Sequence, residues 1–141
     1  MSHNSNRQEI ARLDSKGRVT IPAYMREELG MHEGSYAAVR IDRENSSISI
    51  SLFAGAAAKL AQMMLKIPDR PGALARIART LSELSLDLLA SSSRTLKKGE
   101  LAEWVVIADF AQISMTMEEI KKKILENRDA LSVEIKEMPA D

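Results

Sequence analysis

The sequence predicts two domains: an N-terminal all-β domain with one short helix, and a C-terminal α+β domain. Three observations lead to this division. Residues 47–52 alternate polar and apolar side chains strictly, as a half-buried strand does. Residues 74–84 instead repeat apolar side chains at helical spacing. Between them, the small-residue segment 54–58 has no large apolar side chain to anchor it.

Composition excludes several classes of protein. The chain has 141 residues, 28% charged and 45% hydrophobic, which is typical of a folded domain rather than a disordered one. It has no cysteine and two histidines, which excludes disulfides and thiol chemistry and disfavours a metal site. The sequence shows no leader and no apolar run of about 18 residues. We therefore expect a cytoplasmic protein that does not associate with membranes.

The beginning of the chain combines a polar stretch with a turn and a short strand. Residues 1–7 are polar and patternless, and we expect a disordered start. The sequence D-S-K-G at 14–17 predicts a turn. The β-branched run at 19–21 predicts a strand, which Pro22 would end because proline cannot donate to a sheet ladder.

The rest of the first half predicts a short helix and a pair of strands. Tyr24 to Leu29 is long enough for about two helical turns. Gly30 suits the left-handed residue that ends a helix. Strands are expected at 36–41 and 47–52, around the turn D-R-E-N-S. These elements define a predicted domain over residues 8–53.

We place a linker at 54–60 and the second domain at 61–141. The second domain differs from the first in the spacing of its apolar residues, because strand patterns alternate with helical ones. A capping box, Thr116-x-x-Glu119, marks the start of its second helix. The predicted order is β-α-β-β-α-β, the ferredoxin-like arrangement. The elements are expected, in that order, at 63–67, 74–84, 86–92, 104–108, 116–125 and 132–136.

The net charge of zero conceals an uneven distribution. Up to Arg26 the chain carries five basic and two acidic groups, whereas Glu27 to Phe53 carries two basic and five acidic ones. A neutral total can therefore hide a basic face. Four of the basic residues surround the turn at Gly17 and the start of the short helix: Arg12, Lys16, Arg18 and Arg26. Taken alone, the pattern also fits a solvated hairpin with scattered charge.

The motif D-S-K-G-R-V-T-I-P at 14–22, together with M-R-E-E-L-G at 25–30, resembles the AbrB/MazE/SpoVT swapped-hairpin family. The resemblance covers residues 9–53. It implies an intertwined homodimer in which hairpins of two chains form one barrel. It also implies binding of double-stranded DNA by basic residues of the first loop and the helix start. Those roles carry over to Arg12, Lys16, Arg18 and Arg26. Glu27 departs from the family, because basic residues occur there in some members.

The second motif, P-D-R-P-G-A-L at 68–74, lies between a strand and a helix. Gly72 allows close approach of a neighbour, and the free N–H groups of the following helical turn favour an anion. Residues 61–138 resemble an ACT domain in this motif and in L-D-L at 86–88. The resemblance implies pairing of two domains and an amino acid bound at their interface. The implied ligand-binding residues are Asp69, Arg70, Pro71, Gly72, Ala73 and Leu74, with Asp87 opposite.

Many ligand-binding members of that family carry asparagine where this chain has Asp69 and Asp87. An ionised carboxylate accepts hydrogen bonds but cannot donate them. Two carboxylates would suit an amino group and would repel a carboxylate. An ACT domain that serves only for dimerisation is therefore an open alternative.

No catalytic constellation stands out in the sequence. There is no nucleophile beside a base, no Gly-rich phosphate loop and no metal-ligand spacing, so we expect neither an enzyme nor a metal or cofactor. Trp104 is expected in the core. We expect Lys121-Lys122-Lys123, which has glutamates around it, to be a solvated helix face rather than a nucleic-acid patch.

Together the two resemblances predict a DNA-binding transcriptional regulator, a homodimer or tetramer, whose ACT domain senses a small molecule such as an amino acid. An effector would change the spacing of the DNA-binding faces if it bound two arrangements differently. The alternative is a protein-interaction module, either antitoxin-like or a regulatory subunit of an amino-acid enzyme. In that alternative the basic loop would be incidental.

Overall fold

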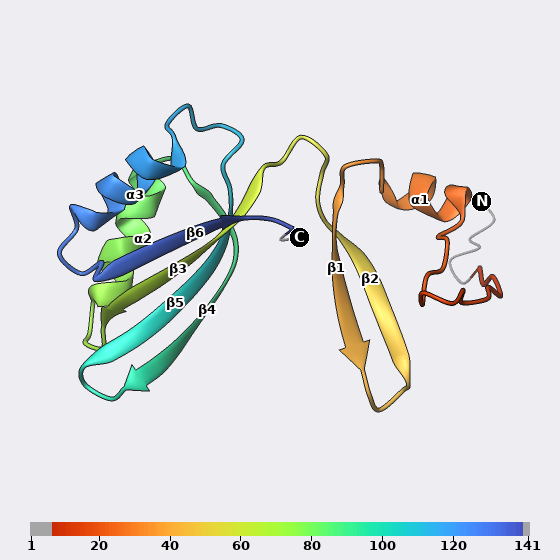
Figure 1. Cartoon of the computed structure of the whole chain (residues 1–141), viewed down its shortest axis with the longest axis horizontal. Coiled ribbons are helices and arrows are strands. Elements are labelled where there is room, and N and C mark those ends of the chain that lie inside the picture. Colours follow the sequence, from red (N-terminus) through yellow and green to blue (C-terminus); the bar gives the residue numbers. More distant parts are fainter. Residues whose placement is uncertain (1–6, 140–141) are drawn as a thin grey trace. The chain divides into compact units, whose positions relative to one another are not determined.

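The computed structural model describes residues 7–139. It divides between Ala56 and Ala57 into two compact units, each with its own sheet (Figure 1). The predicted disordered start falls outside the described residues, apart from Arg7. Within residues 7–139, no helix is long and apolar enough to cross a membrane.

The N-terminal unit opens with the predicted turn. The backbone N–H of Asp14 donates to the carbonyl of Arg18 at 3.1 Å, and that of Gly17 donates to Asp14 at 3.0 Å. Gly17 has φ +75°, a left-handed conformation that side chains rarely adopt. The turn is therefore closed by the backbone and depends on glycine at this position.

Helix α1, Ala23–Leu29, confirms the short helix expected here. Pro22 occupies its N-cap position, where the missing N–H costs little because the first helical amides lack partners anyway. Gly30 ends the helix in the left-handed conformation, with φ +71°, as its position predicted. None of the helical residues is buried, so α1 has no core of its own to pack against.

Strands β1, Tyr36–Asp42, and β2, Ser47–Ala54, form a two-stranded antiparallel sheet. Their register pairs Val39 with Ile50 and Ile41 with Ile48, which places these side chains on one face. That face remains largely exposed: Val39, Ile41 and Ile48 each keep 64–67% of their surface. We call Val39, Ile41, Ile48, Ile50 and Leu52 the apolar hairpin face.

The strand predicted at 19–21 is wrong for a single chain. Residues 19–22 have no regular secondary structure, and within residues 7–139 β1 pairs with β2 alone. A β-branched run becomes a strand only when another strand takes its backbone hydrogen bonds. No described segment of the single chain does so, and the predicted swapped-hairpin barrel, which needs the hairpins of two chains, is not shown.

The C-terminal unit has the predicted β-α-β-β-α-β order. Its four strands form an antiparallel sheet in the order β4-β5-β3-β6. Both helices lie on one face of that sheet (Figure 1). The strands are β3 (Leu60–Pro68), β4 (Asp87–Lys97), β5 (Leu101–Asp109) and β6 (Ser132–Glu137), and the helices are α2 (Ala73–Glu83) and α3 (Met117–Leu125).

The core lies between the sheet and its helices. Met63 and Leu65 of β3 and Ile77 of α2 are fully buried, as is Ile124 of α3. Trp104 is 5% exposed, which confirms its expected place in the core. The capping box of α3 is also present: the Glu119 N–H donates to the Thr116 hydroxyl at 3.1 Å, and the Thr116 N–H donates to the Glu119 carboxylate.

Several strands are longer than expected. The connection between units is shorter than the predicted 54–60, because β2 includes Ala54 and β3 begins at Leu60. Strand β4 runs to Lys97 rather than ending near residue 92, so the turn follows at 98–100. The polar run at 91–94 concealed this length. An edge strand tolerates such residues because one of its sides meets no other strand.

Candidate functional site

The β3–α2 loop, residues 69–72, carries most of the predicted ligand-binding residues. Gly72 has φ +85° and occupies the N-cap position of α2, which begins at the buried Ala73. The Ala73 N–H donates to the carbonyl of Arg70 at 3.3 Å, closing the turn. Pro71 and Leu74 are exposed beside it. The loop thus places Asp69 to Leu74 together, at the end of β3.

Asp69 ties this loop to the turn between β4 and β5. Its carboxylate accepts a hydrogen bond of 2.7 Å from the N–H of Gly99, and its own N–H donates to the carbonyl of Glu100 at 3.2 Å. The carboxylate thus has a structural partner within the chain. To bind a ligand, the Asp69 carboxylate would have to keep its hydrogen bond with the Gly99 N–H beside the new contact, or lose that bond.

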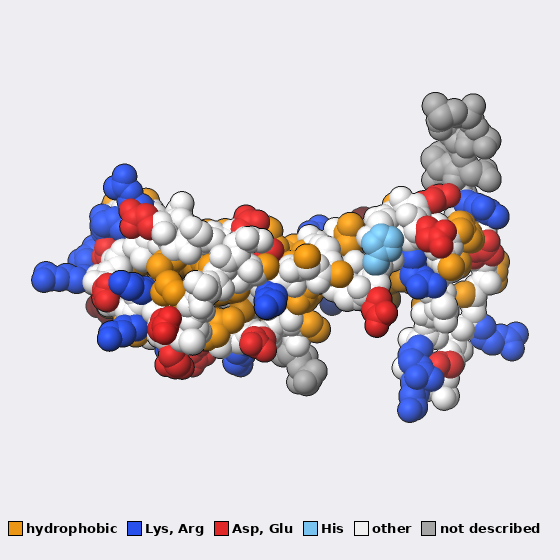
Figure 2. Space-filling model, turned by 90° about the horizontal axis from the view of Figure 1, so that it is seen from above, with side chains coloured by type: hydrophobic (Ala, Val, Ile, Leu, Met, Phe, Trp, Pro, Cys, Tyr) orange, Lys and Arg blue, Asp and Glu red, His pale blue; other side chains and the backbone are white. Residues whose placement is uncertain are grey.

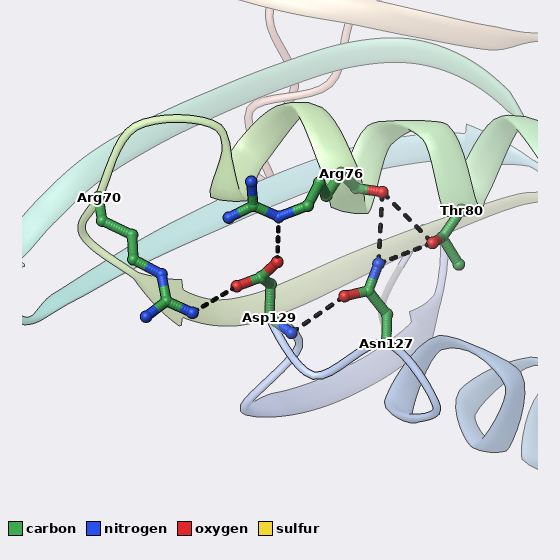
Figure 3. Close-up of polar contacts among 5 residues, drawn as sticks. All are labelled: Arg70, Arg76, Thr80, Asn127 and Asp129. Atoms are coloured by element: carbon green, nitrogen blue, oxygen red, sulfur yellow. Dashed lines mark hydrogen bonds and ion pairs between the residues drawn. The ribbon is translucent and has the colours of Figure 1, made fainter.

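Arg70 and Arg76 converge on Asp129, from the loop between α3 and β6 (Figure 3). Arg70 Nη2 lies 2.9 Å from Asp129 Oδ1, and Arg76 Nε lies 2.5 Å from Oδ2. The hydrogen bond from Arg76, then that from Arg70, lowers the pKa of Asp129 below its ordinary value. The same bond raises the pKa of Arg76. Asp129 therefore stays ionised, with an arginine at each oxygen.

Asn127 completes this network from the same loop (Figure 3). Its side-chain amide donates to Thr80 Oγ1 at 2.9 Å and to the carbonyl of Arg76 at 3.3 Å. Its side-chain oxygen accepts from the N–H of Asp129 at 3.0 Å. The segment after α3 is thereby fastened to α2, and it holds the Asp129 carboxylate against the β3–α2 loop.

Asp87, predicted to face the loop across the interface of two paired domains, lies at the other end of the sheet within one chain. It begins β4 and pairs with Asp109, which in turn pairs with Leu60 at the start of β3. The loop follows Pro68, the last residue of that nine-residue strand. A strand advances about 3.3 Å per residue, so one chain does not bring Asp87 to the loop. A site that contains both needs a second copy.

The predicted DNA-contacting residues all belong to the N-terminal unit, and all four are exposed. The Nε of Arg18 donates to Asp14 at 2.7 Å, and the Nε of Arg26 donates to the carbonyl of Ile21 at 3.1 Å. Hydrogen bonds from the backbone and then the side chain of Arg18 lower the pKa of Asp14, which keeps it anionic. The charge of Arg18 is thus partly balanced. Basic and acidic side chains are interspersed over the surface seen in Figure 2.

Contacts at Tyr24 hold the first described residues against α1. The Arg7 guanidinium lies 4.2 Å from the centre of the Tyr24 ring, and the Tyr24 hydroxyl donates to Glu9 at 2.8 Å. Desolvation, followed by the bond to Glu9, raises the pKa of Tyr24. In residues 7–139, no group of three or more His, Asp or Glu side chains is arranged to hold a metal ion.

Comparison with protein families gives the class of the C-terminal unit. The family model of the ACT domain matches residues 61–124. The chain therefore contains an ACT domain, whose predicted loop lies at the start of α2. ACT domains bind small-molecule effectors, often amino acids, and often dimerise, which gives this unit a regulatory, small-molecule-sensing role. Residues 1–60 show nothing specific in these comparisons, so the swapped-hairpin resemblance stays a prediction.

Two solved structures are similar to part of the chain. The ACT domain of the GTP pyrophosphokinase of Chlorobium tepidum is 14% identical, with a TM-score of 0.45, and covers 56% of this chain and 99% of that one. The C-terminal domain of the MgtC protein of Mycobacterium tuberculosis is 9% identical, with a TM-score of 0.42, and covers 57% and 88%. The search of curated proteins found no match.

Proposed function

We propose that the protein is a DNA-binding transcriptional regulator whose ACT domain senses a small molecule, an amino acid being the best candidate. The observation that supports this most is the combination in one chain of an ACT domain with a unit that presents exposed basic side chains around a tight turn and a short helix. The sensing unit supplies the signal, and the N-terminal unit supplies the output.

The N-terminal unit has features that suit pairing with a second copy. Its apolar hairpin face is exposed, and its β-branched segment 19–21 has no strand partner. A second copy would cover the face and take the hydrogen bonds of the segment. Pairing would also double the four predicted DNA-contacting residues. DNA phosphates would meet the basic side chains, with arginines able to contact guanine edges.

The ACT unit has a free edge at β4 that suits a second contact. An antiparallel pairing of two β4 strands centred on Ser92 would set Asp87 of each chain near Lys97 of the other, with opposite charges facing. Lys97 pairs with Leu101, which also pairs with Pro68 at the start of the β3–α2 loop. This arrangement would therefore place Asp87 of one copy at the same end of the paired sheet as the loop of the other, about three strand spacings from Pro68.

A charge exchange tests that arrangement. Asp87→Lys should weaken pairing of the ACT units, and Asp87→Lys with Lys97→Asp in the same chain should restore it, since both opposite pairs are regained with reversed sign. The measurement is the dissociation constant from a dilution series in sedimentation velocity. If the double variant associates as weakly as the single one, this register is wrong.

DNA binding is tested with duplexes selected from a random-sequence pool by the full-length protein. Arg18→Ala and Arg26→Ala should each weaken binding and make its salt dependence shallower, because each removes a phosphate-binding charge. Arg43→Ala, which removes an exposed arginine from the β1–β2 turn, is the matched control. Failure to select any duplex, or equal losses in all three variants, would contradict the DNA-binding role.

Coupling between the units is tested by repeating the DNA titration with each of the common amino acids. An effector should shift the affinity for DNA, and DNA should shift the affinity for the effector by the same factor.

The alternative function, a protein-interaction module, is favoured by the ion pair between Arg18 and Asp14, which partly balances the charge of Arg18. This alternative predicts that the protein does not bind DNA. It also predicts that substitutions in the apolar hairpin face abolish binding of a protein partner.

A further inference from the structure

The contact between Asp129 and the β3–α2 loop comes from outside the matched part of the ACT domain, which ends at residue 124. The Asp129 side chain is 7% exposed, whereas Arg70 and Arg76 keep 61% and 52% of their side-chain surface. A nearly buried carboxylate thus holds two otherwise exposed arginines, one from the loop and one from the first turns of α2. Asp129, although distant in the sequence, therefore holds a residue on each side of Gly72.

Arg76 occupies the space that Gly72 leaves open. A Cβ atom built on Gly72 would lie 2.7 Å from Arg76 Nη1. The guanidinium therefore lies directly against the backbone at the start of α2, and its Nε is bound to Asp129. A ligand that approaches the Gly72 backbone from this side would have to displace Arg76, and Asp129 resists that displacement.

We propose that Asp129 is a positioning residue that latches the β3–α2 loop in a closed form, with Arg76 lying over Gly72. Opening requires Arg76 to leave Asp129, and Asn127 keeps Asp129 in place by accepting its N–H. The latch builds on the proposed sensing function, because it regulates access to the predicted effector loop. An effector that binds only the open form has its apparent affinity lowered by the fraction of molecules that are closed.

Amide hydrogen exchange of the full chain, without any ligand, tests the latch. Asp129→Asn keeps the shape but removes the charge, and should speed exchange of the amides in residues 70–76 by about three- to tenfold, because charged hydrogen bonds are lost. Amides of β5 should be unchanged. Glu126→Gln, which neutralises an exposed carboxylate nearby, is the matched control. Equal exchange of the loop in Asp129→Asn and wild type would overturn the proposal.

Three further variants separate a latch from general destabilisation. Arg76→Met changes a half-exposed side chain, so folding should be preserved, and it should open the loop as Asp129→Asn does. Asp129→Asn should then speed amide exchange less in the Arg76→Met variant than in wild type, because Arg76 is no longer present to be released. Asp129→Glu restores the charge and should rescue most of the protection. Additive effects, or no rescue by glutamate, would contradict the latch.

Effector binding is measured separately, by calorimetry with the common amino acids. Any amino acid that binds wild type should bind Arg76→Met several-fold more tightly if the closed form competes with it. Weaker or equal binding would show that Arg76 does not block the site. If no amino acid binds any variant, the proposed sensing of amino acids fails, whereas the exchange experiment still decides whether the loop is latched.

Discussion

The two units of this protein differ in how they bury apolar surface. In the ACT unit, buried side chains from three strands and both helices form one core, with Leu65, Ile77 and Ile124 fully enclosed. Among residues 7–56 no residue is buried, and the isoleucines of the hairpin are 40–67% exposed. A chain segment of this size gains little from its own core. The comparison indicates that the ACT unit has a hydrophobic core of its own, whereas the described part of the N-terminal unit does not.

The largest effect is expected from truncating the ACT core. Leu65→Ala should lower the free energy of unfolding by about 3 kcal/mol, through lost burial and the cavity left behind. Trp104 is the single tryptophan and is buried in this core, so its fluorescence during urea unfolding reports on the ACT unit alone. Ile48→Ala in the hairpin should leave that transition unchanged. A loss below about 1 kcal/mol in Leu65→Ala would mean that the site relaxes to fill the cavity.

The next effect concerns the apolar hairpin face. If a second copy covers it, Ile48→Asp should weaken association by about tenfold or more, since fully burying one such side chain contributes about 1.5–3 kcal/mol. Dilution in sedimentation velocity measures this. Ser49→Asp, on the other face of the same strand, is the control, because Ser49 pairs with Arg40 rather than with Ile41. Similar weakening by both variants would show that charge, not the apolar face, is responsible.

A smaller effect is expected at the start of α3. Thr116→Ala removes the hydroxyl that accepts the Glu119 N–H, and should lower the free energy of unfolding by about 1 kcal/mol. The Trp104 transition is again the measurement, and Ser114→Ala, which leaves the capping box intact, is the comparison. An unchanged midpoint in Thr116→Ala would mean that water replaces the cap without loss.

The smallest effect is the acid dependence from Asp129, because its two arginines are more than half exposed and well screened. Folding lowers the pKa of this carboxyl, chiefly through Arg76 and then Arg70. Its stabilisation is thus present above the ordinary aspartate pKa of about 3.9, and is lost as the pH falls through the lower folded value. The stability difference between wild type and Asp129→Asn should shrink from pH 7 to pH 3. A difference that stays constant would contradict this origin.

Local signals in the sequence predicted much of the fold. Gly17 and Gly30 occupy left-handed positions, and the Thr116 capping box starts α3, because each of these depends on residues within one turn of chain. The element order of the ACT unit followed from the change between strand and helical periodicity. The turn before α2 was predicted by the same kind of local pattern, whereas the assignment of residues 69–74 to a ligand site rested on the resemblance to the ACT domain.

Contacts between residues that are distant in the sequence could not be predicted from the sequence. Asp129 lies 59 residues from Arg70 and 53 from Arg76, and no periodicity links an isolated aspartate after a helix to either arginine. The position of Asp87 at the far end of the sheet likewise follows from strand order and direction, which only the packed sheet defines.

By itself the sequence determined where the turns, helix ends and strand patterns lie, because these are set by backbone conformation and side-chain spacing over a few residues. Tertiary structure decided which strands found partners, leaving residues 19–21 without one in a single chain, and it placed Asp129 against the β3–α2 loop. The physical reason is that hydrogen bonds and ion pairs between distant segments form only after the chain has packed.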